Sequence, residues 1–385
     1  MNDEEILIRN KILENAVNFL SNPDNNSALK KDNLKIEKLS SGLTNHLYVV
    51  SLSNDEKYFL KIFGTISKLN LVDRNFENLL IQFNSKLGLC PSLIKSNEFY
   101  RIEEYLNNVY KPEDDHLYDE NFLMQVIHVV TEFELSSMKF ERDILRNLIE
   151  DKTIFCFLEK IINLSKNKFK LISELAMNWS PDIYEKLIKV KNFVDNFTEI
   201  FGNLTKEIKS LPLILNHCDV HKHNLLINKS SNKLMLIDYE YACFNFVGFD
   251  FVNYFVESIF DLEYPSFPFY KKKIDNVSIL FEDELYYKMY LEYINVLERK
   301  INIIVEDTLQ DEYIKSSLAK YDFNILRNKN YFFTILAVSS LFWFYAALIS
   351  IEFEKIMDES HFDFLGYSID RLSIYEAAIK ILNKN

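Results

Sequence analysis

The chain has 385 residues, 48% of them hydrophobic, so it is long enough to bury more than one core. Lys and Arg number 44 against 57 Asp and Glu, and the net charge of -13 argues against a general affinity for nucleic acid or anionic membranes. The four cysteines form no CxxC pair, which argues against a zinc ribbon or a disulfide framework and predicts a reducing, cytoplasmic location.

The first hundred residues predict a small lobe rich in β-structure. The start, "MNDEEILIRNKILENAVNFL", is acidic and lacks the pattern of a signal peptide, and its apolar spacing predicts an amphipathic helix. After "SNPDNNS", three strands are expected in "NLKIEKLSSG", "HLYVVSLS" and "KYFLKIFG", the last two joined by the turn "NDE". A helix then ends at Gly88, with Pro91 shortly after, and strands resume in "PSLIKSNEFYRIEEYL". We assign residues 1–106 to this N-terminal lobe.

Helical patterns dominate from about residue 119, interrupted by a β-like pair around "KLMLIDYEY". Residues 107–385 are therefore expected to form a large, mainly helical C-terminal lobe. Within it, residues 331–351 carry no charge over a length that could cross a bilayer, but four Ser and Thr residues dilute that signal. We interpret the segment as the central helix of a large lobe, with no stable membrane insertion, and keep a membrane anchor as the alternative.

The stretch "HCDVHKHN" places three histidines and a cysteine within residues 217–224. These residue types suit a transition metal, yet the stretch has neither an HExxH nor a CxxC spacing. The other interpretation rests on Asp219 and Asn224, separated by four residues as in a kinase catalytic loop. There the aspartate orients the substrate hydroxyl and the asparagine carbonyl reaches Mg²⁺. Asp238, after the apolar run "LMLI", is the expected second magnesium ligand.

The N-terminal lobe supplies candidates for nucleotide binding. Between two expected strands, "SSGLTN" offers small polar residues whose backbone N–H groups can approach phosphates: Ser41, Gly42, Thr44 and Asn45. On the next strand, Lys61 is a point charge that can reach the phosphates of ATP. Glu77, on the following helix, is a candidate partner for Lys61, as the corresponding glutamate is in kinases; the alternative is a side chain on the solvent-exposed face of that helix.

Together these motifs resemble the choline/ethanolamine kinase family, and choline kinase most. "LNHCDVHKHNLLI" followed by "LMLIDYEYACFNFVGFDFVNYFVE" is similar to its paired signature of HND, four residues, N, then IDFEY and FD-x2-N-x-F-x-E. "GLTNHLYVVSL", "GLCPSLIKSNEFYRIEEYL" and "FDFLGYSIDRL" resemble its phosphate loop, its adenine-side strand and hinge, and its C-terminal helix. The resemblance implies an α+β, protein-kinase-like two-lobed fold that uses ATP and Mg²⁺.

The resemblance assigns residues to roles. It makes Asp219 the catalytic aspartate and Asn224 and Asp238 the magnesium ligands, and it leaves His221 and His223 incidental. The expected nucleotide contacts are Ser41, Gly42, Thr44, Asn45, Lys61 and, at the hinge, Glu104, Tyr105 and Leu106. The expected amino-alcohol pocket comprises Tyr241, Glu257, Trp343, Tyr367 and Arg371.

A quaternary ammonium needs aromatic faces and a carboxylate, because it cannot donate a hydrogen bond. Choline kinases usually have a second Trp three residues after the first, whereas this chain has Ala346 there with Tyr345 beside it. A neighbouring ring such as Tyr345 could compensate, or the pocket is looser. The segment "YPSFPFY" looks more like the choline branch.

The leading hypothesis is an ATP-dependent choline kinase that makes phosphocholine for the nucleotide-activated route to phosphatidylcholine. The alternatives are an ethanolamine kinase and a catalytically silent protein that binds nucleotide or amino alcohol. Aminoglycoside phosphotransferases share the Asp-x4-Asn logic, but their pockets tend to be acid-rich rather than aromatic. The resemblance also raises the prospect of a homodimer, and no nucleic-acid partner is expected.

Overall fold

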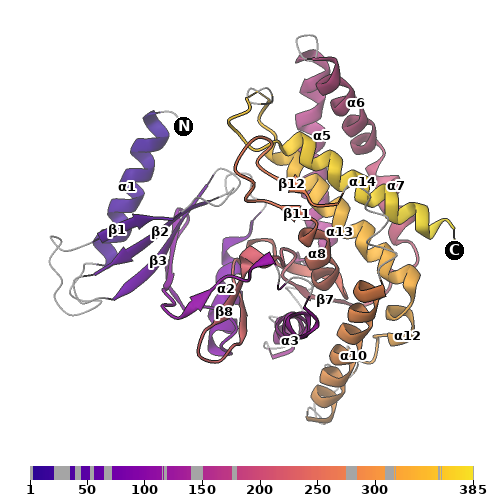
Figure 1. The fold of residues 1–385 in the computed structure, drawn as a ribbon, viewed down its shortest axis with the longest axis horizontal. Helices are drawn as coiled ribbons and strands as arrows, with labels where there is room; N and C mark the ends of the chain where they lie inside the picture. The colour runs from indigo at the N-terminus through magenta and orange to yellow at the C-terminus, as the bar shows by residue number, and fades with distance from the viewer. Residues whose placement is uncertain are drawn as a thin grey trace. The chain divides into compact units, whose positions relative to one another are not determined.

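The fold was analysed in a computed structural model. It describes residues 3–20, 35–39, 45–52, 56–64, 72–114, 116, 119–139, 151–175, 180–274, 284–307, 316, 318–353, 356 and 358–384. The chain forms two compact units, one of residues 1–110 with 226–240 and one of residues 111–225 with 241–385. The first is built on sheets and the second is mainly helical, as the ribbon in Figure 1 shows, so the predicted α+β class is confirmed.

The first unit is organised by a five-stranded antiparallel sheet with the strand order β1-β2-β3-β5-β4. Its strands are β1 (Lys35–Lys38), β2 (Asn45–Ser51), β3 (Lys57–Phe63), β4 (Leu93–Ser96) and β5 (Tyr100–Glu104). The hairpin predicted around "NDE" is present, with Ser51 opposite Lys57 and Asn45 opposite Phe63. Lys61 of β3 faces Arg101 of β5 in the register, so the two cations are held on adjacent strands in the middle of the sheet.

The predicted helix between β3 and β4 is α2 (Arg74–Lys86). It begins where the Asp73 carboxylate accepts hydrogen bonds from the backbone N–H groups of Asn75 and Phe76, which satisfies two donors of the first turn. It ends before Gly88, whose φ of 73° is the left-handed conformation that glycine adopts without strain. Helix α2 thereby carries Arg74 and Glu77 on its first turn.

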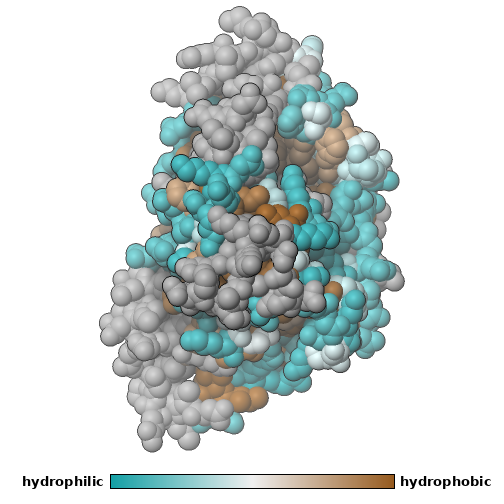
Figure 2. Space-filling view, turned by 90° about the vertical axis from the view of Figure 1, so that its left-hand side faces the viewer, coloured by the Kyte–Doolittle hydropathy of each residue, from teal (hydrophilic) through white to brown (hydrophobic). Residues whose placement is uncertain are grey.

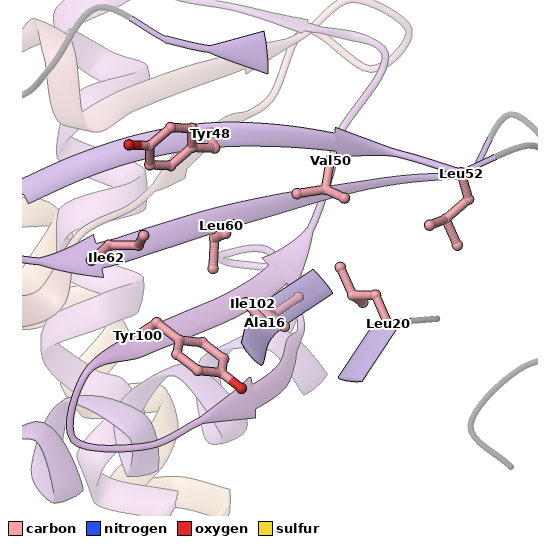
Figure 3. Packing of buried hydrophobic residues seen from close by; sticks show 9 residues of the cluster. All are labelled: Ala16, Leu20, Tyr48, Val50, Leu52, Leu60, Ile62, Tyr100 and Ile102. Carbon is pink, nitrogen blue, oxygen red and sulfur yellow. The ribbon is translucent and has the colours of Figure 1, made fainter. Parts of the chain in front are cut away.

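An apolar core lies between one face of the sheet and the N-terminal helix α1 (Asp3–Leu20). Ala16 and Leu20 of α1 pack against the alternate, inward-facing residues of the strands, as seen in Figure 3. The residues of the sheet side are Tyr48, Val50, Leu60, Ile62, Tyr100 and Ile102 in the strands, with Leu52 directly after β2. Burial of each large apolar side chain contributes about 1.5–3 kcal/mol, so α1 stabilises the sheet that presents Lys61.

A second, three-stranded sheet brings a distant segment of sequence into the first unit. It comprises β6 (Val109–Tyr110), β8 (Leu225–Asn228) and β9 (Leu234–Leu236), in the order β6-β8-β9. The N–H of Leu236 donates to the carbonyl of Leu89, just beyond α2. This anchoring places Asp238, two residues after β9, in the same unit as Lys61.

The second unit is dominated by long helices, which Figure 1 shows in magenta to yellow. They are α3 (Glu120–Ser136), α5 (Ile154–Leu175), α6 (Pro181–Asp195), α7 (Phe197–Thr205), α8 (Phe249–Ser258), α10 (Glu284–Asp307), α13 (Lys329–Ser350) and α14 (Phe364–Leu382), with the single turn α12 (Phe323–Leu326) before α13. Short elements of this unit are the 3₁₀ turns Ser137–Lys139 and Lys222–Asn224, and the paired strands β7 (Leu213–Asn216) with β10 (Cys243–Phe246) and β11 (Phe260–Asp261) with β12 (Lys271–Lys272). The 3₁₀ turn Tyr239–Tyr241 lies where the chain passes from the first unit to the second.

The uncharged segment of residues 331–351 is helix α13, which is apolar all round. Among the described residues it is the one helix long and apolar enough to cross a membrane, and 89% of its most apolar window is buried inside the protein. It packs against α14, α8 and α5. This burial supports the interpretation as a central helix. On the face of the molecule shown in Figure 2, the described residues are mainly hydrophilic, with small apolar patches among them.

Candidate active site

The loop carrying the predicted catalytic aspartate begins where strand β7 ends at Asn216. The Asn224 amide nitrogen donates to Oδ2 of Asp219 at 2.9 Å and to the Asp219 carbonyl at 3.0 Å. Because the nitrogen of that amide makes both contacts, its carbonyl oxygen is the atom that remains for a cation. The loop therefore brings together the two residues that the sequence assigned to the reacting hydroxyl and to Mg²⁺.

Asp250, on the first turn of α8, fixes the backbone of this loop through hydrogen bonds. Its two carboxylate oxygens accept the backbone N–H groups of His217 and Cys218, both at 2.7 Å, and the side chain is fully buried. Burial raises the pKa of Asp250 to about 7, although the two N–H groups lower it. Cys218 has a φ of 65°, a strained conformation for a residue other than glycine, and the two bonds fix the backbone there.

Asn253, one turn further along α8, supports the other side of the loop. It donates to the carbonyl of Val220 at 3.4 Å and accepts from the Ser339 hydroxyl of α13 at 2.8 Å. We did not assign roles to Asp250 and Asn253 from the sequence, although both stand in the quoted stretch "GFDFVN". The sequence feature that could have pointed to them is a pair of polar residues, three positions apart, within an otherwise apolar run.

The structure does not bring the histidines of "HCDVHKHN" around one point. His217 accepts the N–H of Asp219 and lies 5.7 Å from the Phe133 ring, measured between centroids. Nε2 of His221 lies 3.4 Å from Oδ1 of Asp219, whereas Nδ1 of His223 lies 3.3 Å from Glu263. Burial lowers the pKa of His223 to about 3. Within the described residues, the group of side chains spaced to hold a metal ion is a different one, in the first unit.

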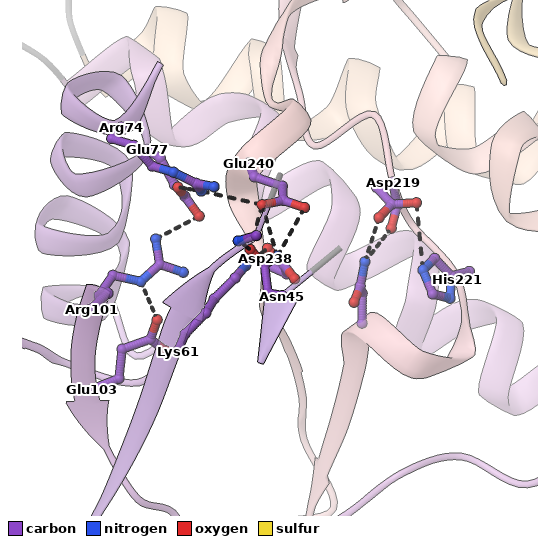
Figure 4. Close-up of polar contacts among 12 residues, drawn as sticks. Asn45, Lys61, Arg74, Glu77, Arg101, Glu103, Asp219, His221, Asp238 and Glu240 are labelled. Carbon is purple, nitrogen blue, oxygen red and sulfur yellow. Dashed lines mark hydrogen bonds and ion pairs between the residues drawn. The ribbon is translucent and has the colours of Figure 1, made fainter. Parts of the chain in front are cut away.

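That group consists of Glu77, Asp238 and Glu240, whose ligand oxygens lie within 4.8 Å of one another. Lys61 lies among them, with its ammonium 2.5 Å from Asp238 and 3.4 Å from Glu240, as Figure 4 shows. Burial lowers the pKa of Lys61, but the carboxylates, Asp238 first, outweigh burial and raise it above its ordinary value. Lys61 is therefore a buried positive charge among these carboxylates.

The predicted ion pair between Lys61 and Glu77 is wrong. Glu77 instead pairs with Arg74 and Arg101, each at 2.5 Å, and Lys61 pairs with Asp238 and Glu240. Arg101 lies opposite Lys61 in the β3–β5 register, and its guanidinium forms the ion pair with the α2 carboxylate in place of the Lys61 ammonium. Burial raises the pKa of Glu77, but Arg101, then Lys61 and Arg74, lower it more, to about 2.

Glu240 is the residue that sequence reasoning missed in this unit. It is buried, receives the Asn45 amide at 3.2 Å and pairs with Arg74 at 3.2 Å. It stands two residues after Asp238 in "IDYEY", and side chains at that spacing reach the same region when the backbone turns. Asp238 has a φ of 70°, which supplies that turn.

The remaining expected nucleotide contacts fall into two groups. Asn45 opens β2, and its side-chain oxygen accepts the N–H of Gly64 at 3.3 Å. Ser41, Gly42 and Thr44 lie outside the described residues. Glu104 closes β5, and its N–H donates to the Ser92 carbonyl; Tyr105 and Leu106 follow it directly as the predicted hinge.

The expected amino-alcohol residues come together in the second unit. Arg371 of α14 contacts the carboxylate of Glu257, at the end of α8, and the hydroxyl of Tyr367. All three side chains are buried. Burial lowers the pKa of Arg371, but Glu257 and Tyr367 raise it above its ordinary value, so the arginine stays charged. Its guanidinium carbon lies 4.6 Å from the Phe260 ring centroid, 4.9 Å from that of Tyr367 and 6.0 Å from that of Trp343.

Trp343 and Tyr241 add two further rings, with centroids 5.3 Å apart. Tyr345 does not compensate for Ala346, because its ring is fully buried against Phe197 at 4.5 Å and Phe344 at 4.9 Å. Successive residues of a helix point in different directions, so the side chain beside Ala346 faces another part of the core. Beside Glu257 lies a small hollow lined by His221, Lys222, His223, Tyr254, Glu257, Ser258, Phe260 and Leu262.

A family model and the curated relatives of the chain point to the same protein family. A family model described as choline/ethanolamine kinase matches residues 36–376. A human choline/ethanolamine kinase is 25% identical over 260 residues, 64% of this chain and 60% of that protein, so the chain spans less than two thirds of that relative's length. A rat choline/ethanolamine kinase is 24% identical over 305 residues, 76% of this chain and 71% of that protein. A probable ethanolamine kinase from Arabidopsis thaliana is 23% identical over 242 residues, 60% of this chain and 59% of that protein.

Solved structures share the fold. A choline kinase from Cryptosporidium parvum has a TM-score of 0.62 at 22% identity, covering 92% of each chain. An ethanolamine kinase from Plasmodium vivax has a TM-score of 0.58 at 16% identity, covering 95% of this chain and 87% of that one. At these identities the likeness establishes the fold alone, which is the predicted protein-kinase-like fold with a β-rich N-terminal part and a helical C-terminal part.

Proposed function

The chain belongs to the choline/ethanolamine kinase family, and from that premise we propose that it transfers the γ-phosphate of ATP to the hydroxyl of a small amino alcohol. The observation that carries the proposal is the Asp219 carboxylate, held 2.9 Å from the Asn224 amide on a loop that Asp250 pins at two backbone N–H groups. A loop fixed in this way positions a proton acceptor for an incoming hydroxyl at little further entropic cost. The overlap with the family extends through residues 36–376.

Asp219 is the proposed catalytic residue. Its carboxylate would accept or orient the proton of the substrate hydroxyl, so that the oxygen can attack the γ-phosphorus in line while ADP leaves. Lys61 supplies a buried, permanently charged ammonium for the phosphates, because the surrounding carboxylates raise its pKa. Asn45 stands at the start of β2, where the phosphate loop ends.

The oxygen donors of the chain suit Mg²⁺. The carbonyl oxygen of Asn224 remains unused by the Asp219 contacts, and Asp238 belongs to a group of three carboxylates whose oxygens lie within 4.8 Å. Hard oxygen ligands of this kind are those that magnesium prefers. The family resemblance names Asn224 and Asp238 as ligands of the ion, and we keep both as the proposed donors; the ion would offset the charge of the transferred phosphate.

We propose choline as the substrate and phosphocholine as the product, with ethanolamine as the alternative. Three rings lie near the guanidinium of Arg371, namely Phe260, Trp343 and Tyr367, and Tyr241 lies against Trp343. Aromatic faces attract a quaternary ammonium that has no N–H to donate. The relatives do not separate the two substrates, since both choline and ethanolamine kinases match the chain. Cytoplasmic location and dimerisation remain further parts of the proposal.

The test measures ADP release with MgATP and either choline or ethanolamine, in the wild type and in Asp219→Asn. We expect turnover with choline well above turnover with ethanolamine, and loss of both in the variant with nucleotide binding retained. The Asn side chain keeps the shape of Asp219 but cannot accept the hydroxyl proton, so loss of turnover without loss of binding isolates the chemistry.

The other outcomes separate the alternatives. Preference for ethanolamine would place the chain in the other branch of the family. Absence of turnover with both substrates, together with retained nucleotide binding, would favour a silent binding protein. Matched activity of the wild type and Asp219→Asn would refute the assignment of the catalytic residue.

A further inference from the structure

His221 is one of two histidines that the family resemblance left without a role, and its ring lies against the proposed catalytic carboxylate. Nε2 of His221 is 3.4 Å from Oδ1 of Asp219, and the dashed line in Figure 4 marks this contact. The opposite oxygen, Oδ2, receives the Asn224 amide at 2.9 Å. Each oxygen of Asp219 therefore faces a different nitrogen of the same loop.

The other nitrogen of the ring determines where the proton lies. Nδ1 of His221 accepts the backbone N–H of His223 at 3.3 Å, so this nitrogen carries a lone pair. In a neutral imidazole the proton is then on Nε2, the nitrogen that faces Asp219. The ring is mostly buried, with 15% of the side chain exposed, which keeps it in one orientation.

We propose that His221 is a positioning residue, which donates its Nε2–H to Oδ1 of Asp219 and so fixes which lone pair of the carboxylate is free for the substrate hydroxyl. This inference rests on the proposed function. A carboxylate rotates readily about its terminal bond, and Asn224 alone leaves Oδ1 free to turn away. The separation of 3.4 Å is long for a hydrogen bond, and contacts of this kind shorten when the substrate complex forms.

The hollow beside Glu257 supports a role of His221 in positioning the amino-alcohol hydroxyl that accepts the phosphate. His221 lines it together with Glu257 and Phe260, which contact the Arg371 cluster. A side chain that touches both Asp219 and this hollow is placed to couple the orientation of the carboxylate to the hydroxyl that the hollow admits. His223 also lines the hollow, but its Nδ1 lies 3.3 Å from Glu263 rather than against Asp219.

The kinetic test compares His221→Leu with His221→Gln. Leucine fills a similar space without a donor, whereas the glutamine amide restores an N–H. We expect kcat of His221→Leu to fall about 10- to 100-fold, the range for loss of a hydrogen bond to a charged group, with KM for MgATP and for the amino alcohol within about 2-fold of wild type. His221→Gln should recover most of kcat. His361→Leu, an equivalent change at an exposed turn, is the matched control and should leave kcat unchanged.

A second measurement does not depend on turnover. Long-range ¹H–¹⁵N correlation of the histidine rings in the full chain reports which ring nitrogen carries the proton, and we expect Nε2 of His221 to carry it. A proton on Nδ1, or wild-type kcat in His221→Leu, would overturn the inference. If the wild type lacks turnover with both amino alcohols, the proposed function fails, and the tautomer still decides whether His221 donates to Asp219.

Discussion

Replacing Asp250 with Ala tests whether the catalytic loop is held from beneath by one carboxylate. The substitution removes the acceptors of two fully buried backbone N–H groups, those of His217 and Cys218, each 2.7 Å from an Asp250 oxygen. Each buried donor left without a partner costs about 1–3 kcal/mol, so the free energy of unfolding should fall by about 2–6 kcal/mol. The strained backbone of Cys218, with a φ of 65°, would also lose its restraint.

The effect on catalysis should be larger than the effect on substrate binding. Asp219 follows Cys218 directly, and a displacement of about 1 Å of a catalytic group can cost about 100-fold in rate, so kcat should fall by about that factor. Denaturant titration measures the loss of stability, and ADP release measures kcat in the fraction that remains folded.

Two further variants serve as an intermediate case and a control for Asp250→Ala. Asp250→Asn retains one acceptor oxygen and should lie between wild type and Asp250→Ala in both measurements. Glu376→Ala removes an exposed ion pair with Lys189 and should change stability by less than about 1 kcal/mol. A stability of Asp250→Ala within about 1 kcal/mol of wild type would refute the proposed function of the carboxylate as the support of the loop.

Three other predictions concern the remaining parts of the site. Lys61→Met should lower kcat/KM for MgATP by about 100-fold or more, because it removes a buried positive charge among carboxylates; an unchanged value in steady-state kinetics would contradict that role. The lowered pKa of Glu77, about 2 against an ordinary 4.5, stabilises the fold above pH 4.5 by about 3 kcal/mol, and this contribution should be lost as pH falls from 4.5 towards 2. Unfolding free energies across that range should show a shallower slope for Glu77→Gln than for wild type, and equal slopes would rule the assignment out. Tyr345→Phe should leave KM for choline unchanged and be neutral or stabilising, because it removes a buried hydroxyl that has no hydrogen-bond partner; a raised KM would show that the ring belongs to the pocket after all.

Much of the local structure followed from the sequence alone. The hairpin around "NDE" and the helix from Asp73 to Gly88 depend on turn residues and caps next to each other in the chain, and both are present. The family resemblance was also available, because its motifs are short and contiguous, and the family match over residues 36–376 confirms it. Asp219 and Asn224 could be paired for the same reason, since only four residues separate them on one loop.

The partners of charged side chains could not be derived in this way. Three carboxylates, those of Glu77, Asp238 and Glu240, lie near Lys61 in the folded chain. The β3–β5 register sets Arg101 opposite Lys61, and Arg101 forms the ion pair with Glu77. The contribution of Glu240 likewise depends on the turn at Asp238, where the φ is positive although the residue is not glycine. Long-range pairing of this kind is decided by packing, which local sequence patterns do not encode.

The aromatic residues also show what the sequence predicts and what only the tertiary structure decides. With 32 phenylalanines and 22 tyrosines, composition predicted large apolar cores but could not distinguish a pocket ring from a core ring. Tyr345 and Trp343 are two positions apart on α13, yet one packs against Phe197 and the other lies near Arg371. The sequence by itself determined the elements, the family and the loop of Asp219, because those depend on neighbours along the chain; the tertiary structure alone decided which buried side chains meet, because helix rotation and strand register set their directions.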